Sequence, residues 1–234
     1  RGIYLIQSRR RWRCFISFTH TSIKNLKKNK ISKSWLRKQK KDLFFNQSKI
    51  KGFRSRSAFK LIEMNEKFKF FKKNSLLLDL GSSPGGWSQV ASRKITNGKI
   101  LAVDIKNMEK INKVEFIKGN FLEREVVGKI ITHFNCKVDI VLSDMAANTT
   151  GNKNLDSFRT GELCLNAMEL SRDLLSKNGI FLAKIFMGSI FKEIYINAKK
   201  HFKNVVNYKP ISSKKESKEI YIFCKGVLKY DTYC

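Results

Sequence analysis

Short apolar runs that alternate with helical patterns constrain the fold of this chain more than any other feature. Six runs rich in Leu, Ile and Val predict strands at residues 75–80, 100–104, 114–117, 138–143, 180–186 and 220–224. Helical periodicity falls between them at residues 87–95, 122–134, 160–175 and 189–200, and Asn178-Gly179 is expected to end the third helix. Near-continuous apolar runs are typical of parallel strands covered on both faces. The pattern therefore predicts an α/β domain, a mostly parallel sheet with helices on each side.

The charge of the chain points to its partners. Lys and Arg number 48 against 19 Asp and Glu, a net charge of +29 over 234 residues. Such a charge attracts polyanions, so nucleic acid is the first expectation and an anionic membrane surface the alternative. Residues 1–41 carry 14 of the basic residues and no acid, whereas the remainder has a net charge of +15.

This acid-free leader allows two interpretations. Its arginines interleave with aromatic residues, and Ser and Thr are frequent, as in an organelle transit peptide. A basic RNA-binding arm retained in the mature protein explains the composition equally well. We expect residues 1–41 to be one or the other, followed by one domain over residues 42–234. A transit peptide implies a mitochondrial or other organellar location; the alternative is a nucleolar or cytoplasmic one.

The cysteines and the hydropathy exclude several classes of protein. The five cysteines are scattered and form no CxxC pair, so neither a disulfide framework nor a zinc site is expected, and we expect no metal. No apolar run approaches the roughly 18 residues that a membrane span requires. We expect a monomer without a membrane partner.

A glycine-rich turn follows the first predicted strand, in the segment Asp79-Leu-Gly-Ser-Ser-Pro-Gly-Gly-Trp87. Glycines let the backbone approach a ligand and turn into the next helix. The turn is neither GxGxxG nor a P-loop. Asp104 ends the second strand, where an α/β sheet presents a carboxylate to a ribose diol. Asn120 and Asp144 follow the third and fourth strands, so polar groups gather at the carboxyl edge and predict a nucleoside-containing cofactor.

Seven motifs in order now identify a family. From Ser55 to Gly226 the chain resembles the FtsJ-type ribose 2′-O-methyltransferases, which include enzymes for large-subunit ribosomal RNA. The matching motifs are Ser55-Arg-Ser-Ala-Phe-Lys-Leu61, Asp79 to Gln89, Asp104, Gly119-Asn-Phe121, Ser143-Asp-Met-Ala-Ala-Asn148, Ala183-Lys-Ile-Phe-Met-Gly188 and Ser217-Lys-Glu-Ile-Tyr221. The resemblance implies a Rossmann-like fold with a seven-stranded, mostly parallel sheet, dependent on S-adenosylmethionine.

The resemblance also implies the site residues. A catalytic tetrad falls on Lys60, Asp144, Lys184 and Glu219. The cofactor-binding positions are Asp79, Gly81, Pro84, Gly85, Gly86, Trp87, Asp104, Asn120 and Asp144. A ribose hydroxyl is a poor nucleophile near neutral pH, so orientation and proton removal are the tasks left to the protein. Lys184 could act as the base, or as an ammonium that stabilises the alkoxide, while Asp144 and Glu219 hold the two lysines.

Ordinary structural roles compete with some of these assignments. Trp87 is as consistent with core packing as with cofactor contact, and Glu216 competes with Glu219 for the last tetrad position. Asn120 and Ala147 stand where the family usually has a carboxylate and a proline. The lost carboxylate predicts weaker cofactor binding.

The resemblance would place two groups of basic residues beside the tetrad as phosphate contacts. They are Arg54, Arg56, Lys60, Lys67, Lys69, Lys72 and Lys73, and Lys199, Lys200, Lys203, Lys209, Lys214, Lys215 and Lys218. We therefore expect methylation of a ribose in RNA, most simply a uridine of large-subunit ribosomal RNA, within the ribosomal subunit or as free RNA. The alternatives are a transfer-RNA methyltransferase, a non-catalytic ribosome assembly factor and, from the glycine turn and Asp104 alone, a dehydrogenase.

Overall fold

A seven-stranded sheet forms the centre of the molecule. The computed structural model describes residues 42–148, 150–214 and 216–228. In spatial order the strands are β3 (Glu115–Lys118), β2 (Lys99–Asp104), β1 (Leu76–Leu80), β4 (Val138–Ser143), β5 (Leu175–Phe186), β7 (Glu219–Val227) and β6 (Phe202–Tyr208). Strands β1 to β5 pair in parallel, and β7 runs antiparallel to both of its neighbours. The predicted α/β class with a mostly parallel sheet is confirmed.

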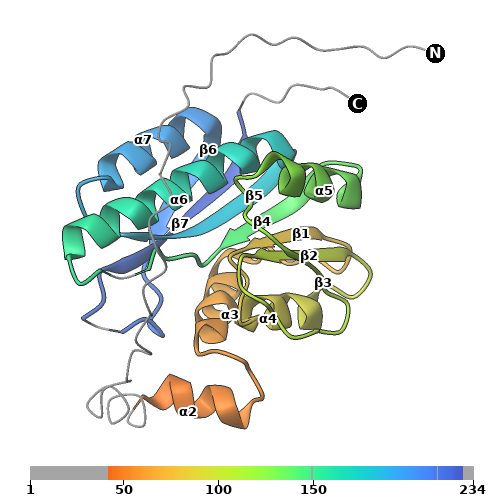
Figure 1. The fold of residues 1–234 in the computed structure, drawn as a ribbon, viewed down its shortest axis with the longest axis horizontal. Coiled ribbons are helices and arrows are strands. Elements are labelled where there is room, and N and C mark those ends of the chain that lie inside the picture. Colours follow the sequence, from red (N-terminus) through yellow and green to blue (C-terminus); the bar gives the residue numbers. More distant parts are fainter. Residues whose placement is uncertain (1–41, 149, 215, 229–234) are drawn as a thin grey trace, which may run out of the picture.

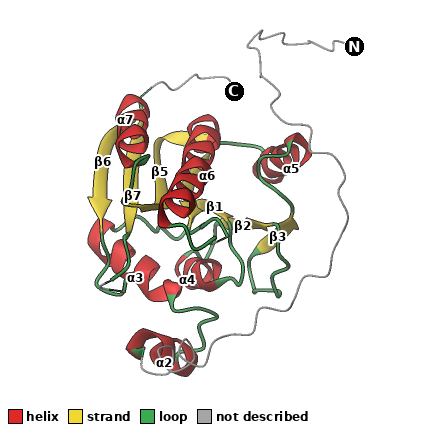
Figure 2. Cartoon of the chain, turned by 60° about the vertical axis from the view of Figure 1, so that its left-hand side comes forward, coloured by secondary structure: helices red, strands yellow, loops and turns green. Residues whose placement is uncertain are grey.

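Helices cover both faces of this sheet (Figures 1 and 2). One face carries α5 (Arg124–Phe134), α6 (Lys153–Leu174) and α7 (Phe191–His201). The other carries α3 (Ser57–Phe68) and α4 (Gly86–Lys94). The short helix α2 (Leu43–Ile50) precedes α3 and begins with Asp42, whose side chain caps it by accepting from Phe45 N. The molecule is therefore a three-layer α/β/α domain.

Side-chain alternation along the strands divides the core into two clusters. In β5, Phe181, Ala183 and Ile185 pack toward α5–α7, whereas Ile180 and Leu182 pack toward α3 and α4. Successive strand residues point to opposite faces, so Lys184 lies on the α3–α4 face. This alternation determines which face of the sheet, and therefore which helices, the polar side chains at each strand end lie against.

Three expectations about the elements were incomplete or wrong. The apolar pattern does not predict β6, an edge strand whose buried Phe202 and Val205 alternate with exposed polar residues. Helix α6 begins at Lys153, seven residues before the predicted start at Thr160, because Asn152 caps it by accepting from Asn154 N and Leu155 N. The prediction that Asn178-Gly179 ends this helix is wrong: the helix ends at Leu174, and both residues lie in β5.

Neither a membrane-spanning helix nor a metal-binding cluster is found in the described part of the chain. There, no helix is long and apolar enough to cross a bilayer. No group of three or more His, Cys, Asp and Glu side chains within the described ranges could hold a metal ion. Cys136, Cys164 and Cys224 are free thiols, and Cys14 and Cys234 lie outside the described residues.

Candidate active site

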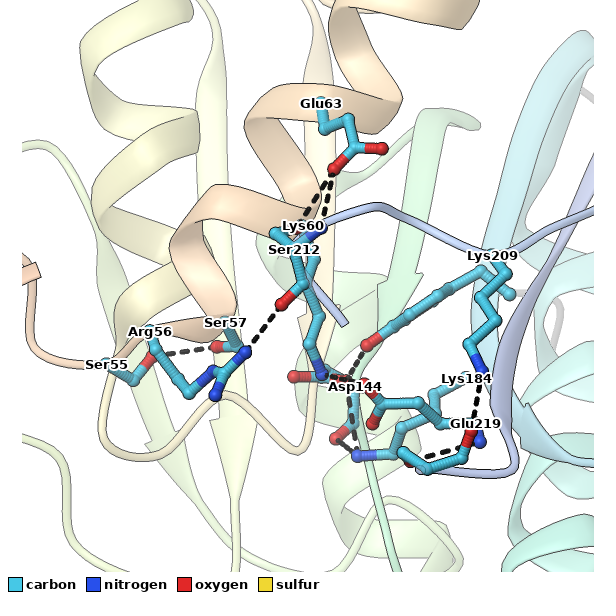
Figure 3. Close-up of polar contacts among 12 residues, drawn as sticks. Ser55, Arg56, Ser57, Lys60, Glu63, Asp144, Lys184, Lys209, Ser212 and Glu219 are labelled. Carbon is cyan, nitrogen blue, oxygen red and sulfur yellow. Dashed lines mark hydrogen bonds and ion pairs between the residues drawn. The ribbon is translucent and has the colours of Figure 1, made fainter. Parts of the chain in front are cut away.

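Four charged side chains from distant parts of the chain meet at the carboxyl edge of the sheet (Figure 3). Lys60 Nζ lies 2.6 Å from Glu219 Oε1. Lys184 Nζ lies 3.2 Å from Asp144 Oδ1 and donates to the Asp144 carbonyl oxygen at 2.6 Å. All four side chains are largely shielded, between 10% and 17% exposed. The structure thus brings together the predicted tetrad, and Lys60 is paired with Glu219 rather than with Glu216.

Strand register explains this convergence. Lys184 in β5 stands directly opposite Tyr221 in β7, so their side chains share one face of the sheet. Glu219, two residues before Tyr221, lies on the same face. Asp144 follows the last residue of β4, next to β5. Lys60 lies in the first turn of α3 and is buried, so this helix places a lysine on the same face.

Tyr221 joins the four residues through its hydroxyl; it ends one of the seven motifs but was not predicted as a site residue. Its hydroxyl donates to Asp144 Oδ1 at 2.8 Å, and Lys60 Nζ lies 5.6 Å from the centre of its ring. The side chain is fully buried, and burial together with the nearby Asp144 charge raises the pKa of this phenol well above its ordinary value. An aromatic residue within a predicted strand is usually interpreted as part of the hydrophobic core, which explains why Tyr221 was not predicted as a site residue.

The charge state of Asp144 follows from its neighbours. Burial alone would raise the pKa of this carboxyl group. The Lys184 and Lys60 ammonium groups and the Tyr221 hydroxyl outweigh burial and hold the pKa below its ordinary value. Asp144 is therefore a carboxylate at neutral pH, held between two lysines.

A cavity of about 340 Å³ adjoins this cluster, and Asp144 belongs to both. It opens at the carboxyl ends of β1 to β4, where ligands bind in open α/β sheets. Its wall includes the predicted cofactor residues Gly81, Asp104, Asn120 and Asp144, with Met145 beside them. The shared carboxylate places the cavity directly next to the lysines.

The other five predicted cofactor residues do not line this cavity. Asp79 is buried and accepts from Ser88 Oγ at 2.6 Å. Pro84 O accepts from Arg54 Nη1 at 3.2 Å. Trp87 Nε1 donates to Ser57 O at 2.9 Å, which agrees with core packing.

The remaining two, Gly85 and Gly86, are packed tightly. A Cβ on Gly85 would lie 2.7 Å from Ile111, and one on Gly86 would overlap Ser55 Oγ. Gly85 also has a φ of 106°, which favours glycine. These residues shape the turn between β1 and α4 rather than the cavity wall.

The cavity residues suit S-adenosylmethionine, the cofactor that the resemblance implies. Two carboxylates in the wall, Asp104 and Asp144, suit a ligand that carries a ribose diol and a positive sulfonium. Both oxygens of Asp104 accept backbone N–H groups, from Ser83 at 2.9 Å and Lys106 at 2.7 Å, which orient the carboxylate while leaving lone pairs for a diol. Asn120 Oδ1 accepts from Leu122 N at 3.1 Å. The lining residues therefore fit the cofactor: Asp104 would be available to its ribose diol, and the Asn120 amide to its base.

Glu63, a carboxylate on α3, holds the connection between β6 and β7 by hydrogen bonds. It was not predicted as a functional residue. Glu63 accepts four hydrogen bonds, from Tyr208 Oη at 2.6 Å, Ile211 N at 2.7 Å, and Ser212 N and Oγ at 3.1 and 3.0 Å. These bonds outweigh the effect of burial and hold the pKa of Glu63 below its ordinary value. Arg56 adds a bond to Ser212 O at 2.6 Å and pairs with Asp42. The lysine-bearing connection is thus held beside the tetrad.

The expected basic flank is only partly correct. Lys69 and Lys72 line a cavity with Ser75 and Asp139, at the amino edge of the sheet and opposite the tetrad. The parallel direction places the end of α7 and the start of β6 at that edge too. The prediction is therefore wrong for Lys69, Lys72, Lys73, Lys199, Lys200 and Lys203.

The remaining basic residues predicted beside the tetrad fall into two groups, those bound by other contacts or not described and those on the tetrad side. Arg54 donates to the carbonyl oxygens of Pro84, Glu109 and Lys110, and is thus committed to loops. Lys67 lies over the Tyr208 ring at 4.3 Å. Lys215 lies outside the described residues. The basic residues that remain on the tetrad side are Arg56, Lys60, Lys209, Lys214 and Lys218.

Comparison with known proteins gives a consistent result. The model of the FtsJ-like methyltransferase family matches residues 53–227. The ribosomal RNA large subunit methyltransferase E of Pelagibacter ubique is 52% identical over 200 residues, which cover 86% of this chain and 98% of that protein. The protein of the same name from Rickettsia conorii is 44% identical over 207 residues, covering 86% and 91%. A solved Plasmodium falciparum structure, described as a ribosomal RNA methyltransferase, is 34% identical with a TM-score of 0.69 and covers 76% of this chain and all of its own. The chain belongs to the FtsJ-like methyltransferase family.

Proposed function

We propose that this protein transfers a methyl group from S-adenosylmethionine to a ribose 2′-hydroxyl in large-subunit ribosomal RNA. One observation carries the proposal: Asp144 is both a wall of the cofactor-sized cavity and the partner of Lys184 at 2.6 and 3.2 Å. A hydroxyl held by Lys184 would therefore lie next to the cavity. Relatives that match this chain over 98% and 91% of their own length bear the name ribosomal RNA large subunit methyltransferase E, which supports the choice of RNA.

The chemistry divides between the cofactor and the chain. S-adenosylmethionine, when bound, supplies an electrophilic methyl group. The chain has to hold the ribose oxygen in line and assist the departure of its proton. Of the three N–H donors of a Lys184 ammonium, one donates to the Asp144 carbonyl oxygen, and Asp144 Oδ1 lies 3.2 Å away, so at least one donor is left for the ribose oxygen.

Each tetrad residue has a distinct role in methyl transfer. Lys184 serves the ribose oxygen in either protonation state: the amine takes up its proton, and the ammonium stabilises the developing alkoxide. Asp144 orients Lys184, and Glu219 orients Lys60. A pH–rate profile separates the two roles of Lys184, because the rate requires its deprotonated form only if it acts as the base.

The connection between β6 and β7 supports RNA as the substrate. It carries Lys209, Lys214 and Lys218, and Glu63 and Arg56 hold it beside the tetrad. Contacts from such lysines to phosphates position a strand without reading its sequence. Binding of RNA should therefore weaken steeply with added salt.

The test is transfer of labelled methyl from S-adenosylmethionine to ribosomal subunits, free ribosomal RNA and transfer RNA. Alkaline hydrolysis then locates the label, because a 2′-O-methylated linkage resists cleavage. We expect labelled, alkali-resistant linkages in large-subunit RNA and none with Lys184→Met. Label on bases would contradict the proposal, label on transfer RNA alone would change its substrate, and no label on any RNA would favour an assembly factor.

We also propose that residues 1–41 are an organellar address, that mitochondria are the destination and that the enzyme acts as a monomer. The leader lies outside the described residues, and its acid-free, Arg-rich composition supports the address. Fusion of residues 1–41 to a fluorescent protein should direct it to mitochondria, and deletion should leave methylation largely intact. Weaker RNA binding after deletion would favour an RNA-binding arm, and sedimentation tests the monomer.

A further inference from the structure

A second cavity, of about 270 Å³, lies at the same edge of the sheet, on the other side of the tetrad from the cofactor cavity. Its wall combines the end of β5, the start of α6 and the connection before β7. The lining residues are Asn154, Asp156, Ser157, Phe186, Met187, Gly188, Glu216 and Lys218. Lys218 was expected as a phosphate contact and Glu216 as the competitor of Glu219 in the tetrad, whereas the other six were not predicted as site residues.

The cavity continues directly from the tetrad. Phe186 stands opposite Glu219 in the β5–β7 register, and Met187 N donates to Lys218 O at 3.0 Å. Phe186 lies two residues beyond Lys184, on the same face of β5 and roughly 6.6 Å along the strand. A group attached to a ribose at Lys184 can therefore reach this cavity.

One buried polar group in the wall lacks a partner. Ser157 is 6% exposed, and within the described ranges its Oγ has no hydrogen-bond partner. Leaving a buried hydroxyl unpaired costs about 1–3 kcal/mol, so such groups are normally satisfied by water or a ligand. Gly188 lies against Ser157 so closely that a Cβ there would overlap its Oγ. Ser157 thus lines the cavity, with its hydroxyl buried beside Gly188.

The chemistry of the wall favours a neutral aromatic ring over a phosphate. Asp156 and Glu216 would repel an anion, and Lys218 offsets only one of them. Phe186 and Met187 supply apolar surface, and a nucleobase stacks readily on an aromatic side chain. Asn154 and Ser157 can both donate and accept, as recognition of a base edge requires.

From these observations we infer that this cavity, the base pocket, binds the base of the nucleotide whose ribose is methylated. The base is joined to the carbon next to the one bearing the 2′-hydroxyl. With that hydroxyl at Lys184, the base points along β5 toward Phe186, and the cofactor cavity lies beyond Asp144. The inference rests on the proposed function, and makes Phe186 and Ser157 residues that determine which base is accepted.

Two substitutions test the base pocket without large changes in volume. Phe186→Leu removes the aromatic face, and Ser157→Ala removes the unpartnered hydroxyl. The matched controls are Phe191→Leu, a half-buried phenylalanine stacked on Tyr195 in α7, and Ser171→Ala, a buried serine in α6 bonded to Ala167 O. Neither control residue lines the base pocket.

The measurement is methyl transfer to RNA with each of the four bases at the methylated position, together with calorimetric binding of S-adenosylmethionine. We expect Phe186→Leu to raise the KM for RNA by roughly 5- to 100-fold, the value of one stacked base. Ser157→Ala should reduce the preference between bases by roughly 3- to 10-fold. Both variants should bind S-adenosylmethionine as the wild type does, and the controls should keep wild-type KM and preference.

The outcomes separate the two proposals. Wild-type KM and base preference in both Phe186→Leu and Ser157→Ala would overturn the base pocket and leave the proposed function standing. A wild-type protein that binds S-adenosylmethionine but methylates no RNA would overturn both.

Discussion

The two faces of the sheet differ in what they bury. The face toward α5, α6 and α7 is packed by apolar side chains, and the buried polar side chains of β4 and α6 on it are uncharged serines and a threonine. The face toward α3 and α4 buries the only two charged residues below 9% exposure in the described part of the chain, Lys60 and Asp79. Tyr221 and the partly shielded Lys184 and Asp144 lie at the edge of that second face.

This difference assigns separate tasks to the two faces. Burying apolar area stabilises the fold, whereas burying charge costs free energy unless each charge is paired. On the α3–α4 face this cost is offset by two ion pairs, Lys60 with Glu219 and Lys184 with Asp144. We therefore expect truncation of core side chains on the α5–α7 face to change stability, and substitution of the tetrad on the α3–α4 face to change methyl transfer.

The largest expected effect is on the α3–α4 face. Lys184→Met keeps the length of the side chain but removes the charged nitrogen, so the single-turnover rate should fall roughly 10²- to 10⁴-fold. The free energy of unfolding should fall less than after a core truncation, because Lys60 and the Tyr221 hydroxyl remain beside Asp144. Lys177→Met, an exposed lysine on the same strand, is the control and should keep wild-type activity.

On the α5–α7 face, Phe181→Ala should show the reverse. Phe181 is fully buried and stacked on Phe202, so truncation should lower the free energy of unfolding by about 3–5 kcal/mol. The milder Ile194→Val should cost about 0.5–1.5 kcal/mol. Denaturant unfolding measures both, and methyl transfer per folded molecule should stay within about threefold of wild type, since about 0.7 kcal/mol of barrier corresponds to that factor.

Asp79 should make the stability depend on pH. Burial raises the pKa of its carboxyl group from 3.8 to about 7, despite the Ser88 hydrogen bond. Between about pH 4 and pH 7 the folded chain keeps a proton that the unfolded chain has released, so stability is lost as the pH rises, by up to about 4 kcal/mol.

Asp79→Asn keeps an acceptor for Ser88 and removes this titration. The difference in unfolding free energy between wild type and variant should therefore grow from pH 4 to pH 7 in favour of the variant. The exposed Asp173→Asn serves as the control. A difference that is the same at every pH would show that Asp79 does not titrate in this range.

The smallest expected effect belongs to Tyr221. Tyr221→Phe removes the hydrogen bond to Asp144 but keeps the ring, so the rate should fall about 2- to 10-fold with little change in stability. Without that hydroxyl the pKa of Asp144 should rise, which moves the acidic limb of the pH–rate profile to higher pH. An unmoved limb would separate Tyr221 from the ionisation that controls the rate.

Much of the fold could be predicted because the buried strands are apolar along their length. Such a run indicates burial on both faces, and five of the six predicted runs fall on the parallel strands β1 to β5. Strand β6 could not be predicted, because an edge strand with Lys203, Asn204 and Asn207 exposed has no such signal. The first two turns of α6 are similarly polar.

The site was predictable to a different degree. Lys60, Asp144, Lys184 and Glu219 were located by family motifs, since periodicity does not report which charges meet across 160 residues of chain. Glu63 reads as an ordinary helix-surface acid, and its four hydrogen bonds exist only once β6 and its connection have folded onto α3. Tertiary contacts of this kind leave no local pattern in a sequence.

The central claim is that the tetrad on the α3–α4 face carries the chemistry, whereas the apolar packing against α5–α7 contributes stability alone. Single-turnover methyl transfer to large-subunit RNA, measured below the unfolding transition and normalised to folded protein, tests it most directly. We expect the rate of Lys184→Met to be at least about 10²-fold below that of Phe181→Ala, although Lys184→Met is the more stable of the two variants. Equal rates for the two variants would contradict it.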